Sequence, residues 1–361
     1  MYIIFYYLKV RLAYFVYGKS YKSSAFFKSG ELYKKYNGSD KKSRWQVFKE
    51  LNDLAKYWKC YPDTYFFLMM FKKGFGDIST MKTFIPQKIY GKYAKNKEPK
   101  YEILINDKIL FHDIMTFYGI PTTNRYFSYA FGVFRNHGKV LQDVEVDELL
   151  SKISAKRIFV KRNKCGCGSG ISVAVKNNDG YFYSKEGMKL TAKNIREAYL
   201  KEEILFEEEI VQDECTKKFN PDSVNTLRVL TFKNKIVGCI IRTGRKGSII
   251  DNATAGGVFA NVDIETGGIG EYAVKEYDST IYYEHPDTHV PFKDQYISQW
   301  KQVVGLVNKV CELMPYYSSV GFDIACSNNG PIVVEINTGA EVLLNQVTIN
   351  IGLADAFINA N

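Results

Sequence analysis

The chain has 361 residues, of which 46% are hydrophobic, so it is long enough for two or three compact domains and does not have the composition of a disordered protein. Its formal net charge of +10 is uneven: residues 1–100 hold 21 Lys and Arg against 7 Asp and Glu, a net +14 that leaves residues 101–361 at −4. Seven cysteines, an odd number in a long chain, favour reduced thiols and a cytoplasmic location over a disulfide framework.

The first segment, MYIIFYYLKVRLAYFVYGK, is apolar and aromatic, but Lys9 and Arg11 interrupt it well before the ~20 residues that a spanning helix needs. It also lacks the basic start and the small-residue cleavage site of a signal peptide. Two alternatives stay open: a helix packed on the protein body, and peripheral contact of residues 1–57 with the inner face of an anionic membrane. No nucleic-acid-binding motif accompanies the basic segment, so we expect no nucleic-acid partner.

Residues 1–100 are predicted to be a mainly helical, basic extension that ends in a polar linker at residues 92–100. The next segment opens with Asn106 and Asp107, which are candidate N-caps, and stops at Gly119. Between them we predict one helix of about three turns. Its apolar pattern consists of Ile109, Leu110, Ile114, Phe117 and Tyr118.

From residue 157 the pattern changes to short strands. RIFVK and ISVAV flank a glycine-rich loop, which indicates an antiparallel hairpin. A helix over residues 191–203 and the strand ILFEE follow, and then LRVLTF and KIVGCIIRTG form a second hairpin. We predict a long helix over residues 294–314 and two closing strands, SVGFDIACS and PIVVEIN. Mixed helices and strands of this kind indicate an α+β fold.

The closing hairpin carries the sharpest chemical signal. A three-residue loop of Asn328, Asn329 and Gly330 pairs Asp323 with Glu335, which places the two carboxylates directly opposite each other. Such a pair repels unless a cation lies beside it, and Asn337 projects from the same face. These are hard oxygen ligands suited to Mg²⁺, with manganese as a substitute.

Two features limit the interpretation of this hairpin. Phe322, Ile324, Val334 and Ile336 alternate with the acids and indicate one buried face, which argues against a solvated edge. With a two-residue loop, however, Asp323 would lie opposite Ile336 and the metal hypothesis would weaken.

A second constellation is FVKRNKCGCGSGISV, in which Lys161 ends a strand and Gly166, Gly168 and Gly170 alternate through the loop. Glycines let backbone amides approach a phosphate, and a lysine supplies the countercharge. No Gly-Lys-Ser/Thr follows, and the next segment is a strand, so neither a Walker loop nor a dinucleotide fingerprint is present. A simple flexible turn is an equally good explanation of the glycines alone.

Arg228 and Arg242 lie on neighbouring predicted strands, where a guanidinium can bind phosphate or carboxylate by paired hydrogen bonds, or form a surface salt bridge. Cys165 and Cys167 lack the further ligands of a zinc site. No Ser or Cys nucleophile stands beside a suitable His base, so covalent hydrolytic catalysis is not supported.

Taken together, these motifs resemble those of the ATP-grasp superfamily, and their residues are similar to those of the sugar-transfer-associated ATP-grasp proteins. The similar segments are NDKILF, GIPTT, FVK with its glycine-rich loop, EEEIVQ, SVNTLRVLTF, DNATAGG, VGFDIA and VVEIN, and they span about residues 58–350. The resemblance implies a first associated subdomain at 101–150, a lobe with a glycine-rich lid at 151–210, and a lobe with the metal site at 211–361.

The resemblance also implies roles for individual residues. The lysines that would touch the ATP phosphates are Lys108 and Lys161, and the lid over the phosphates would be formed by Gly166, Gly168 and Gly170. The interdomain hinge that would hold adenine consists of Glu207, Glu208 and Ile210. The three ligands that would hold magnesium are Asp323, Glu335 and Asn337. Arg228 and Arg242 would hold the γ-phosphate or the acyl oxygens in catalysis.

The implied reaction is ATP-dependent ligation of a carboxylate to an amine through an acylphosphate. The family name adds the expectation of a sugar acid, free or lipid-linked, amidated in cell-surface polysaccharide or capsule synthesis. Two alternatives stay open: a phosphotransferase of the same fold, and a non-catalytic nucleotide-binding partner of a glycosyltransferase.

Overall fold

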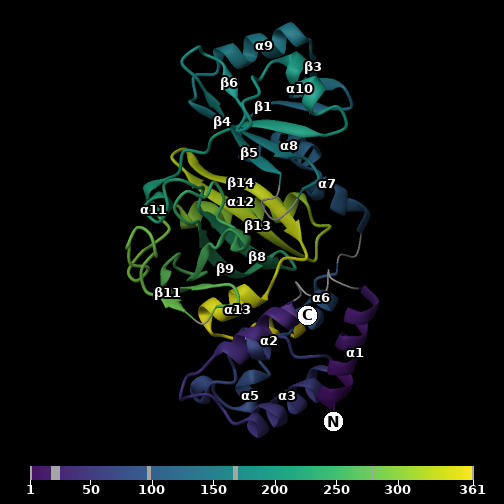
Figure 1. Ribbon diagram of the computed structural model, residues 1–361, viewed down its shortest axis with the longest axis vertical. Coiled ribbons are helices and arrows are strands. Elements are labelled where there is room, and N and C mark those ends of the chain that lie inside the picture. Colours follow the sequence, from purple (N-terminus) through teal and green to yellow (C-terminus); the bar gives the residue numbers. More distant parts are fainter. Residues whose placement is uncertain (1, 18–24, 96–98, 166–169, 279, 360–361) are drawn as a thin grey trace.

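A computed structural model describes residues 2–17, 25–95, 99–165, 170–278 and 280–359. The strands of these residues form two seven-stranded sheets, in which all strand pairs are antiparallel. Figure 1 shows the two sheets as successive layers, with the N-terminal helices beyond the second sheet. The mixture of helices and sheets is the α+β fold class that the sequence predicts.

The first lobe is one sheet with two helices packed on it. Its strands are β1 (Arg125–Ala130), β2 (Val133–Asn136), β3 (Lys139–Leu141), β4 (Arg157–Arg162), β5 (Ile171–Lys176), β6 (Phe182–Tyr183) and β7 (Ile204–Glu208), and its helices are α9 (Asp143–Lys152) and α10 (Ala192–Ala198). The predicted hairpin of β4 and β5 is confirmed. The helix predicted for residues 191–203 is shorter than expected. The strand β1 lies before residue 150 and pairs with β7, which lies after it, so one sheet includes residues from both sides of the predicted boundary between 101–150 and 151–210. That boundary stays a prediction.

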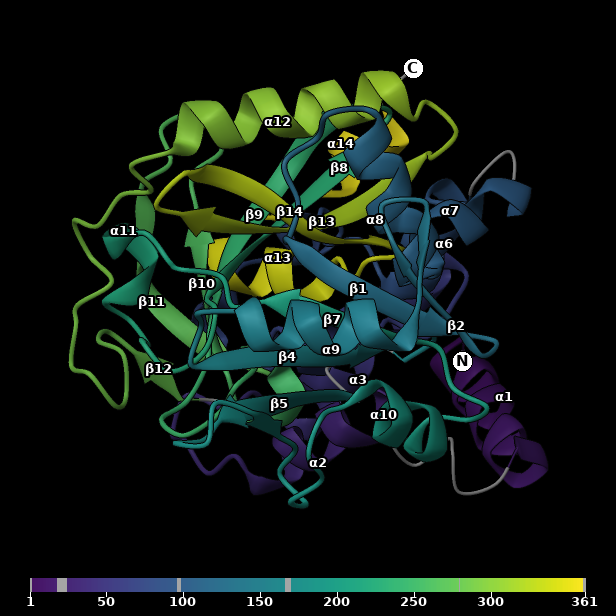
Figure 2. The same ribbon diagram turned by 90° about the horizontal axis from the view of Figure 1, so that it is seen from above.

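The second lobe is built on the sheet order β12-β11-β10-β9-β8-β13-β14. Its strands are β8 (Thr226–Phe232), β9 (Lys235–Thr243), β10 (Val258–Val262), β11 (Ile269–Lys275), β12 (Ile281–Tyr282), β13 (Ser319–Ser327) and β14 (Gly330–Thr338). The predicted hairpin of β8 and β9 is confirmed. Figure 2 shows α12 (Trp300–Leu313) lying along this sheet.

Alternation along β8 divides the two faces of this sheet. Leu227 and Val229 belong to the core under α12, whereas Leu230 belongs to the core shared with the N-terminal helices. Arg228 has the same parity as Leu230, so it lies on the face opposite α12. That face is therefore covered at one end and open for a site at the other.

The long helix α12 is shorter than the predicted 294–314, because it begins at Trp300. The preceding backbone is used elsewhere: Ile269 N–H donates to Gln295 O at 2.8 Å, and Ile297 N–H donates to Gly267 O at 2.9 Å. Residues 295–297 thus continue the sheet instead of starting a helix, since each backbone group can satisfy only one such pattern.

The helix α8 (Lys108–Phe117) confirms the predicted helix and its cap, since the Asp107 carboxylate accepts hydrogen bonds from the N–H groups of Ile109 and Leu110 at 3.0 Å each. The predicted apolar pattern is only partly buried. Ile114 packs against the second-lobe core together with Phe111 and Met115, while Leu110, Phe117 and Tyr118 are exposed. Tertiary packing has therefore selected a buried side that only partly follows the simple apolar spacing.

The N-terminal segment is a group of short helices. They are α1 (Tyr2–Tyr17), α2 (Ala25–Lys35), α3 (Arg44–Trp58), α4 (Thr64–Phe67), η2 (Lys73–Phe75), α5 (Ile78–Met81), α6 (Gln87–Tyr93), η3 (Pro99–Glu102) and α7 (Ile103–Asn106). Four more short helices lie later in the chain, outside this segment. They are α11 (Glu214–Lys217), η4 (Ala253–Ala255), α13 (Leu343–Ile349) and α14 (Ala354–Ile358). Part of the predicted linker 92–100 lies outside the described residues. None of the described helices is long and apolar enough to cross a membrane.

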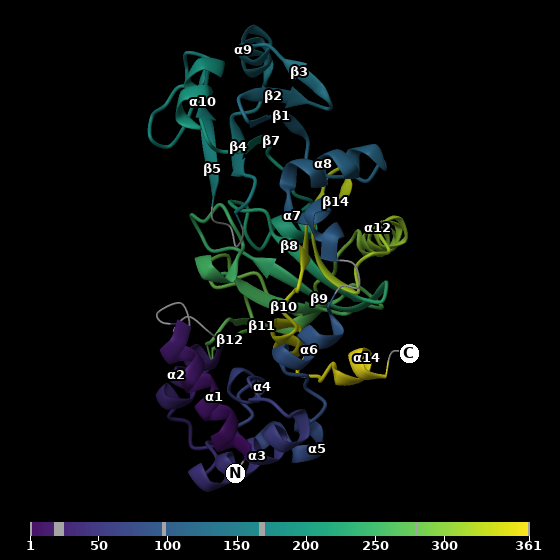
Figure 3. The ribbon, with the colours of Figure 1, turned by 90° about the vertical axis from the view of Figure 1, so that its right-hand side faces the viewer.

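The N-terminal helices share one core with the end of the chain. Leu54 and Phe71 belong to the same buried cluster as Leu343 and Phe357. Figure 1 shows α13 towards the end of the molecule that carries the N-terminal helices, and Figure 3 shows α14 at the same end, away from α9. Residues 25–95 are therefore part of the body of the second lobe.

Candidate active site

The hairpin of β13 and β14 brings the two predicted carboxylates together by an unexpected route. Ser327 lies opposite Gly330, so the turn has two residues and the predicted three-residue loop is wrong. A β-bulge then inserts Val334 between the pairs Ile324 with Val333 and Asp323 with Glu335. The extra residue restores the predicted Asp323–Glu335 pairing.

The bulge also changes which side chains are buried. Val333 and Ile336 enter the core, whereas Val334 lines a cleft between the lobes together with Glu335. The prediction that Val334 lies on the buried face is therefore wrong, because a bulge interrupts the strict alternation of a strand.

Two arginines hold Asp323 from the next strands. Arg228 lies directly opposite Asp323 on β8 and donates through Nε at 2.5 Å and Nη2 at 3.1 Å, and Arg242 Nη2 on β9 lies 2.9 Å from Asp323 Oδ2. Burial alone would raise the pKa of Asp323, but the two guanidinium charges outweigh it and lower the pKa. Asp323 is therefore an anion with both oxygens already engaged.

Glu335 differs from Asp323 in its surroundings. Burial raises the pKa of Glu335, and the negative charge of Asp323 adds to the effect. Glu335 is paired with Lys108, whose Nζ lies 3.9 Å from Glu335 Oε1, at the outer limit of an ion pair. Two adjacent carboxylates with incomplete compensation form a place where an added cation lowers the energy.

Asn337, the third predicted ligand, lies on β14 opposite Gly321 and is half-buried, but it is not among the described residues that line the cleft. Gly321 is needed for close packing: a Cβ there would lie 2.7 Å from Ala340 Cβ and 3.0 Å from Arg228 Cδ. The absence of a side chain leaves the space through which Arg228 reaches Asp323.

The first lobe and α8 contribute two lysines. Lys161 Nζ on β4 donates to Glu207 Oε2 on β7 at 2.6 Å, and both side chains are nearly buried. Burial would raise the pKa of Glu207, but Lys161 outweighs it and lowers the pKa. Lys108 Nζ donates to Cys165 O at 2.6 Å, at the start of the glycine-rich loop. Both lysines, Glu207 and Glu335 line one small cavity beside the main cleft.

The predicted lid is only partly described. Gly166 and Gly168 lie outside the described residues. Gly170 has a positive φ of 78°, and a Cβ there would lie 2.9 Å from Cys165 Cβ, so glycine is required by both conformation and space. The base of the loop is thus tight, and Lys108 is bonded to it.

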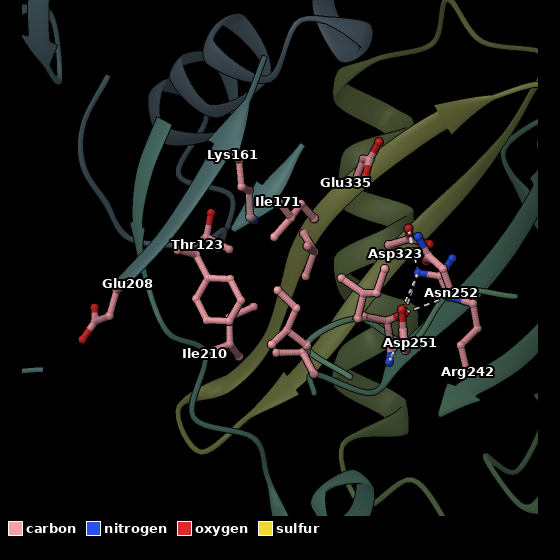
Figure 4. A pocket seen from close by; sticks show the side chains of 16 residues that line it. Thr123, Lys161, Ile171, Glu208, Ile210, Arg242, Asp251, Asn252, Asp323 and Glu335 are labelled. Atoms are coloured by element: carbon pink, nitrogen blue, oxygen red, sulfur yellow. Dashed lines mark hydrogen bonds and ion pairs between the residues drawn. The ribbon is translucent and has the colours of Figure 1, made fainter. Parts of the chain in front are cut away.

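The predicted hinge connects the lobes. Glu208 ends β7, its N–H donates to Asn124 O at 2.8 Å, and Asn328 N–H donates to Val211 O at 3.1 Å, so the hinge is bonded to both lobes. Ile210 and Glu208 line the cleft, whereas the Glu207 side chain turns to Lys161. In Figure 4, Glu208, Ile210 and Thr123 lie on one side of the cleft and Asp323, Arg242 and Asp251 on the other.

The cleft has an apolar and a polar end. Its lining residues are Thr123, Phe159, Lys161, Ile171, Glu208, Ile210, Val224, Thr226, Arg242, Ile249, Ile250, Asp251, Asn252, Asp323, Val334 and Glu335. This mixture suits a small molecule with an apolar body and charged groups.

Several lining residues were not predicted. Phe159 and Ile171 had a signal, because one lies two residues before Lys161 on its strand and the other opposite Lys161 across the hairpin. Asp251 also had a signal, because it opens the segment DNATAGG that is part of the family resemblance. Its carboxylate accepts from Thr226 N–H at 2.9 Å and Thr226 Oγ1 at 2.6 Å, and lies 3.5 Å from Arg242. Burial raises the pKa of Asp251. Its loop crosses the cleft only in the folded chain.

The donor set fits Mg²⁺ bound together with phosphates. No cluster of three or more carboxylate, imidazole or thiol groups that could hold a metal alone is found among the described residues. Magnesium in nucleotide sites is held by one or two carboxylates, with phosphates and water completing its shell. Glu335 supplies one carboxylate, and Asp323 on the adjacent strand supplies a second, whose oxygens also accept from Arg228 and Arg242.

Two α+β lobes with a cleft between them, a lysine on one side and a carboxylate row on the other, define an ATP-grasp protein. The chain belongs to the sugar-transfer-associated ATP-grasp family, which matches residues 90–359. Searches of curated proteins give no match.

Solved ATP-grasp structures resemble the chain at low identity. The ATP-grasp ligase PsnB with its minimal precursor is 13% identical, with a TM-score of 0.39 and coverage of 73% of this chain and 63% of that one. D-alanine–D-alanine ligase from Bacillus anthracis is 14% identical, with a TM-score of 0.36 and coverage of 70% and 62%. Biotin carboxylase from Campylobacter jejuni is 14% identical, with a TM-score of 0.41 and coverage of 71% and 46%. The matched region spans less than two thirds of each of these chains.

Proposed function

We propose that this protein is an ATP- and Mg²⁺-dependent ligase that activates a carboxylate as an acylphosphate and joins it to an amine. The observation that carries the proposal is the opposition of charges around one cleft. Lys161 lies on the first-lobe side of the cleft and the pair Asp323 and Glu335 lies on the second-lobe side. Lys108 lies in the adjoining small cavity, 3.9 Å from Glu335. Family membership supports it, since ligases are among the solved proteins with the same fold.

In this proposal the apolar end of the cleft holds adenine, and the polar end holds phosphates. Phe159, Ile171 and Val334 provide apolar surface for the base. Glu335, Asp323 and Asn337 are the residues proposed to hold Mg²⁺, which neutralises phosphate charge when bound. Lys161 and Lys108 supply the remaining positive charge for the phosphates.

The two arginines have different proposed roles. Arg242 lines the cleft, where its guanidinium bonds Thr226 Oγ1 at 2.7 Å, and it is placed to hold the transferred phosphoryl group or the acyl oxygens. Arg228 does not line the cleft and instead donates twice to Asp323. It is therefore proposed to position Asp323, and Arg242 to bind substrate.

The chemistry is two transfers in sequence. A carboxylate oxygen of the substrate attacks the γ-phosphorus of ATP, the bond to the ADP oxygen breaks, and ADP leaves. The amine nitrogen then attacks the acyl carbon, inorganic phosphate leaves, and the amine loses a proton to solvent. The protein's contribution to both steps is positioning and charge neutralisation.

The finer substrate class rests on the family name. We propose a sugar acid as the carboxylate and an amino acid or amine as the nucleophile, in cell-surface polysaccharide synthesis, by analogy with the sugar-transfer association of the family. A cytoplasmic enzyme at the inner membrane face suits a lipid-linked sugar.

Isothermal titration of Mg-ATP tests the nucleotide site. The wild type is expected to bind with micromolar affinity, and Glu335→Ala with Asn337→Ala to lose binding, while the exposed control Glu197→Ala binds normally. Absence of binding by well-folded wild type contradicts the whole proposal.

Hydroxylamine trapping tests the reaction. A panel of uronic acids with ATP and hydroxylamine is expected to yield a hydroxamate and ADP, because hydroxylamine intercepts an acylphosphate. A stable phosphorylated product without hydroxamate would identify a phosphotransferase. Nucleotide binding without any ADP formation would leave the non-catalytic partner of a glycosyltransferase.

A further inference from the structure

Over residues 2–9 and 12, whose side chains the structure describes, the helix α1 has a buried and an exposed side. Ile3 is 6% exposed and its N–H lies 3.4 Å from Asn52 Oδ1 on α3, and Tyr6 packs against the same N-terminal core. Ile4, Phe5, Leu8 and Leu12 are 47%, 53%, 59% and 63% exposed. The helix therefore has a buried side and an apolar side that faces out.

Helix geometry places the exposed residues in one stripe. At about 100° per residue, Ile4, Phe5, Leu8 and Leu12 lie within an arc of about 100°, opposite the side that carries Ile3. Single exposed apolar side chains are common on proteins, but a continuous apolar stripe along a surface helix marks a contact site.

The charge around the stripe indicates what covers it. Lys9 is exposed and its Nζ lies 4.3 Å from the centre of the Phe5 ring. Residues 1–100 carry 21 Lys and Arg against 7 Asp and Glu. A second copy of this chain would bring two basic segments together and repel, whereas an anionic surface would attract both the helix and its surroundings.

We propose that α1 lies flat in the interface of an anionic lipid membrane, with Ile4, Phe5, Leu8 and Leu12 inserted below the headgroups and Lys9 among them. Sixteen residues give a helix about 24 Å long, which suits a position along the membrane surface. Figures 1 and 3 show α1 at the opposite end of the molecule from α9. This inference does not depend on the proposed ligase reaction.

Vesicle sedimentation tests the proposal on the full-length protein. The wild type is expected to pellet with vesicles of phosphatidylcholine and phosphatidylglycerol, and less with phosphatidylcholine alone or in high salt. Leu8→Glu with Leu12→Glu is expected to weaken partitioning at least about tenfold, because both side chains leave the apolar layer and two negative charges are added.

The matched control is Val144→Glu with Leu200→Glu, two similarly exposed apolar residues of the first lobe at 63% and 67%. It is expected to pellet like the wild type. Equal pelleting of the Leu8/Leu12 variant, or no pelleting of the wild type, overturns the proposal. A wild-type dimer in solution that the Leu8/Leu12 variant abolishes, without vesicle binding, would assign the stripe to a second copy instead.

A second variant covers the case in which the charged substitutions disturb folding. Phe5→Trp places a fluorophore on the stripe without adding charge. Its emission is expected to shift to the blue with anionic vesicles and to be quenched by brominated lipid chains. An unchanged spectrum of the folded variant in the presence of these vesicles overturns the proposal.

Discussion

Asp323 and Glu335 lie side by side on neighbouring strands, yet their surroundings move their pKa values in opposite directions. Two guanidinium groups keep Asp323 ionised, so it contributes a fixed negative charge. Glu335 is left with an incomplete charge balance. Of the two, Glu335 is therefore the carboxylate with most to gain from a bound cation.

Lys161 is expected to support stability as well as nucleotide binding, because Glu207 is nearly buried and Lys161 is its ion-pair partner. Lys161→Met should lower the free energy of unfolding by about 3 kcal/mol, since it leaves a buried charge without a partner. Adding Glu207→Gln should recover much of that loss but no nucleotide affinity. Urea denaturation of the wild type, of Lys161→Met and of the double variant measures the three free energies of unfolding.

The neighbouring pair of Lys164 and Glu203, in which the lysine side chain is 65% and the glutamate side chain 16% exposed, is the control for this prediction. Lys164→Met should change stability much less, because solvent screens that pair. Equal losses for the two lysine substitutions would contradict the buried-pair interpretation.

Asp63 gives a pH prediction away from the cleft. Burial raises its pKa from 3.8 to about 6. A raised carboxylate pKa means that the native state binds the proton more tightly than the unfolded state, so this group lowers stability as pH rises from about 3.8 to about 6. Asp63→Asn, which keeps an acceptor for Gln87 N–H, should be more stable than the wild type at neutral pH, by roughly 1–2 kcal/mol.

Thermal unfolding across that pH range measures the Asp63 effect. The advantage of Asp63→Asn should vanish at the acid end, where the wild-type carboxyl is protonated too. A variant that is less stable at neutral pH would show that the ionised carboxylate has a stabilising partner.

At the scale of elements, one bulge and one glycine position the two carboxylates Asp323 and Glu335. The bulge at Val334 brings Glu335 opposite Asp323 in spite of the two-residue turn. Gly321 on β13 then lets Arg228 of β8 cross to Asp323. The site therefore depends on two local departures from a regular strand with side chains on both faces.

Gly321→Ala is expected to destabilise the protein by about 1–3 kcal/mol through overpacking against Ala340 and Arg228. Adding Ala340→Gly should restore part of the stability, because it removes the contact at 2.7 Å. Mg-ATP affinity should stay reduced in both, since Arg228 remains displaced. Chemical denaturation and calorimetric titration measure the two effects, with Ala340→Gly alone as the control.

Full recovery of nucleotide affinity in the double variant would show that Arg228 does not position Asp323. No loss of stability in Gly321→Ala would show that the backbone of β13 shifts to accommodate a Cβ at this position.

At the scale of the whole molecule, the N-terminal segment and the chain end form one unit with the second lobe. Gln346 on α13 accepts from Ile85 N–H at 2.8 Å and donates to Ile85 O at 3.0 Å, and Tyr90 OH lies 2.9 Å from Ser319 Oγ on β13. These buried contacts join parts of the chain that are more than 200 residues apart. Residues 1–57 contribute Val47, Leu51 and Leu54 to the core that these contacts border, so removing residues 1–57 would open that core.

Gln346→Met should lower the free energy of unfolding by about 2 kcal/mol or more, because it leaves the buried backbone N–H and C=O of Ile85 unsatisfied. The exposed substitution Gln46→Met on α3 should cost far less. Urea denaturation followed by circular dichroism measures both. Equal costs would indicate that water or backbone adjustment satisfies Ile85.

The sequence by itself determined those elements and candidate site residues that depend only on neighbouring positions in the chain. The hairpins around the glycine-rich loop and between β8 and β9, the Asp107 cap, and the carboxylates on the last hairpin follow from turn chemistry, capping and alternation within about ten residues. The facing of Asp323 and Glu335 was predicted for an incomplete reason, because the turn is shorter and a bulge compensates for it.

Only the tertiary structure decided which partners these residues have. Lys161 meets Glu207 across 46 positions and Arg228 meets Asp323 across 95. The helix α8 buries Phe111, which was outside the predicted apolar pattern, and exposes Phe117, which was in it. Partner choice and the buried side of a helix depend on burial and charge balance after the chain closes on itself, and neither is a property of a short segment.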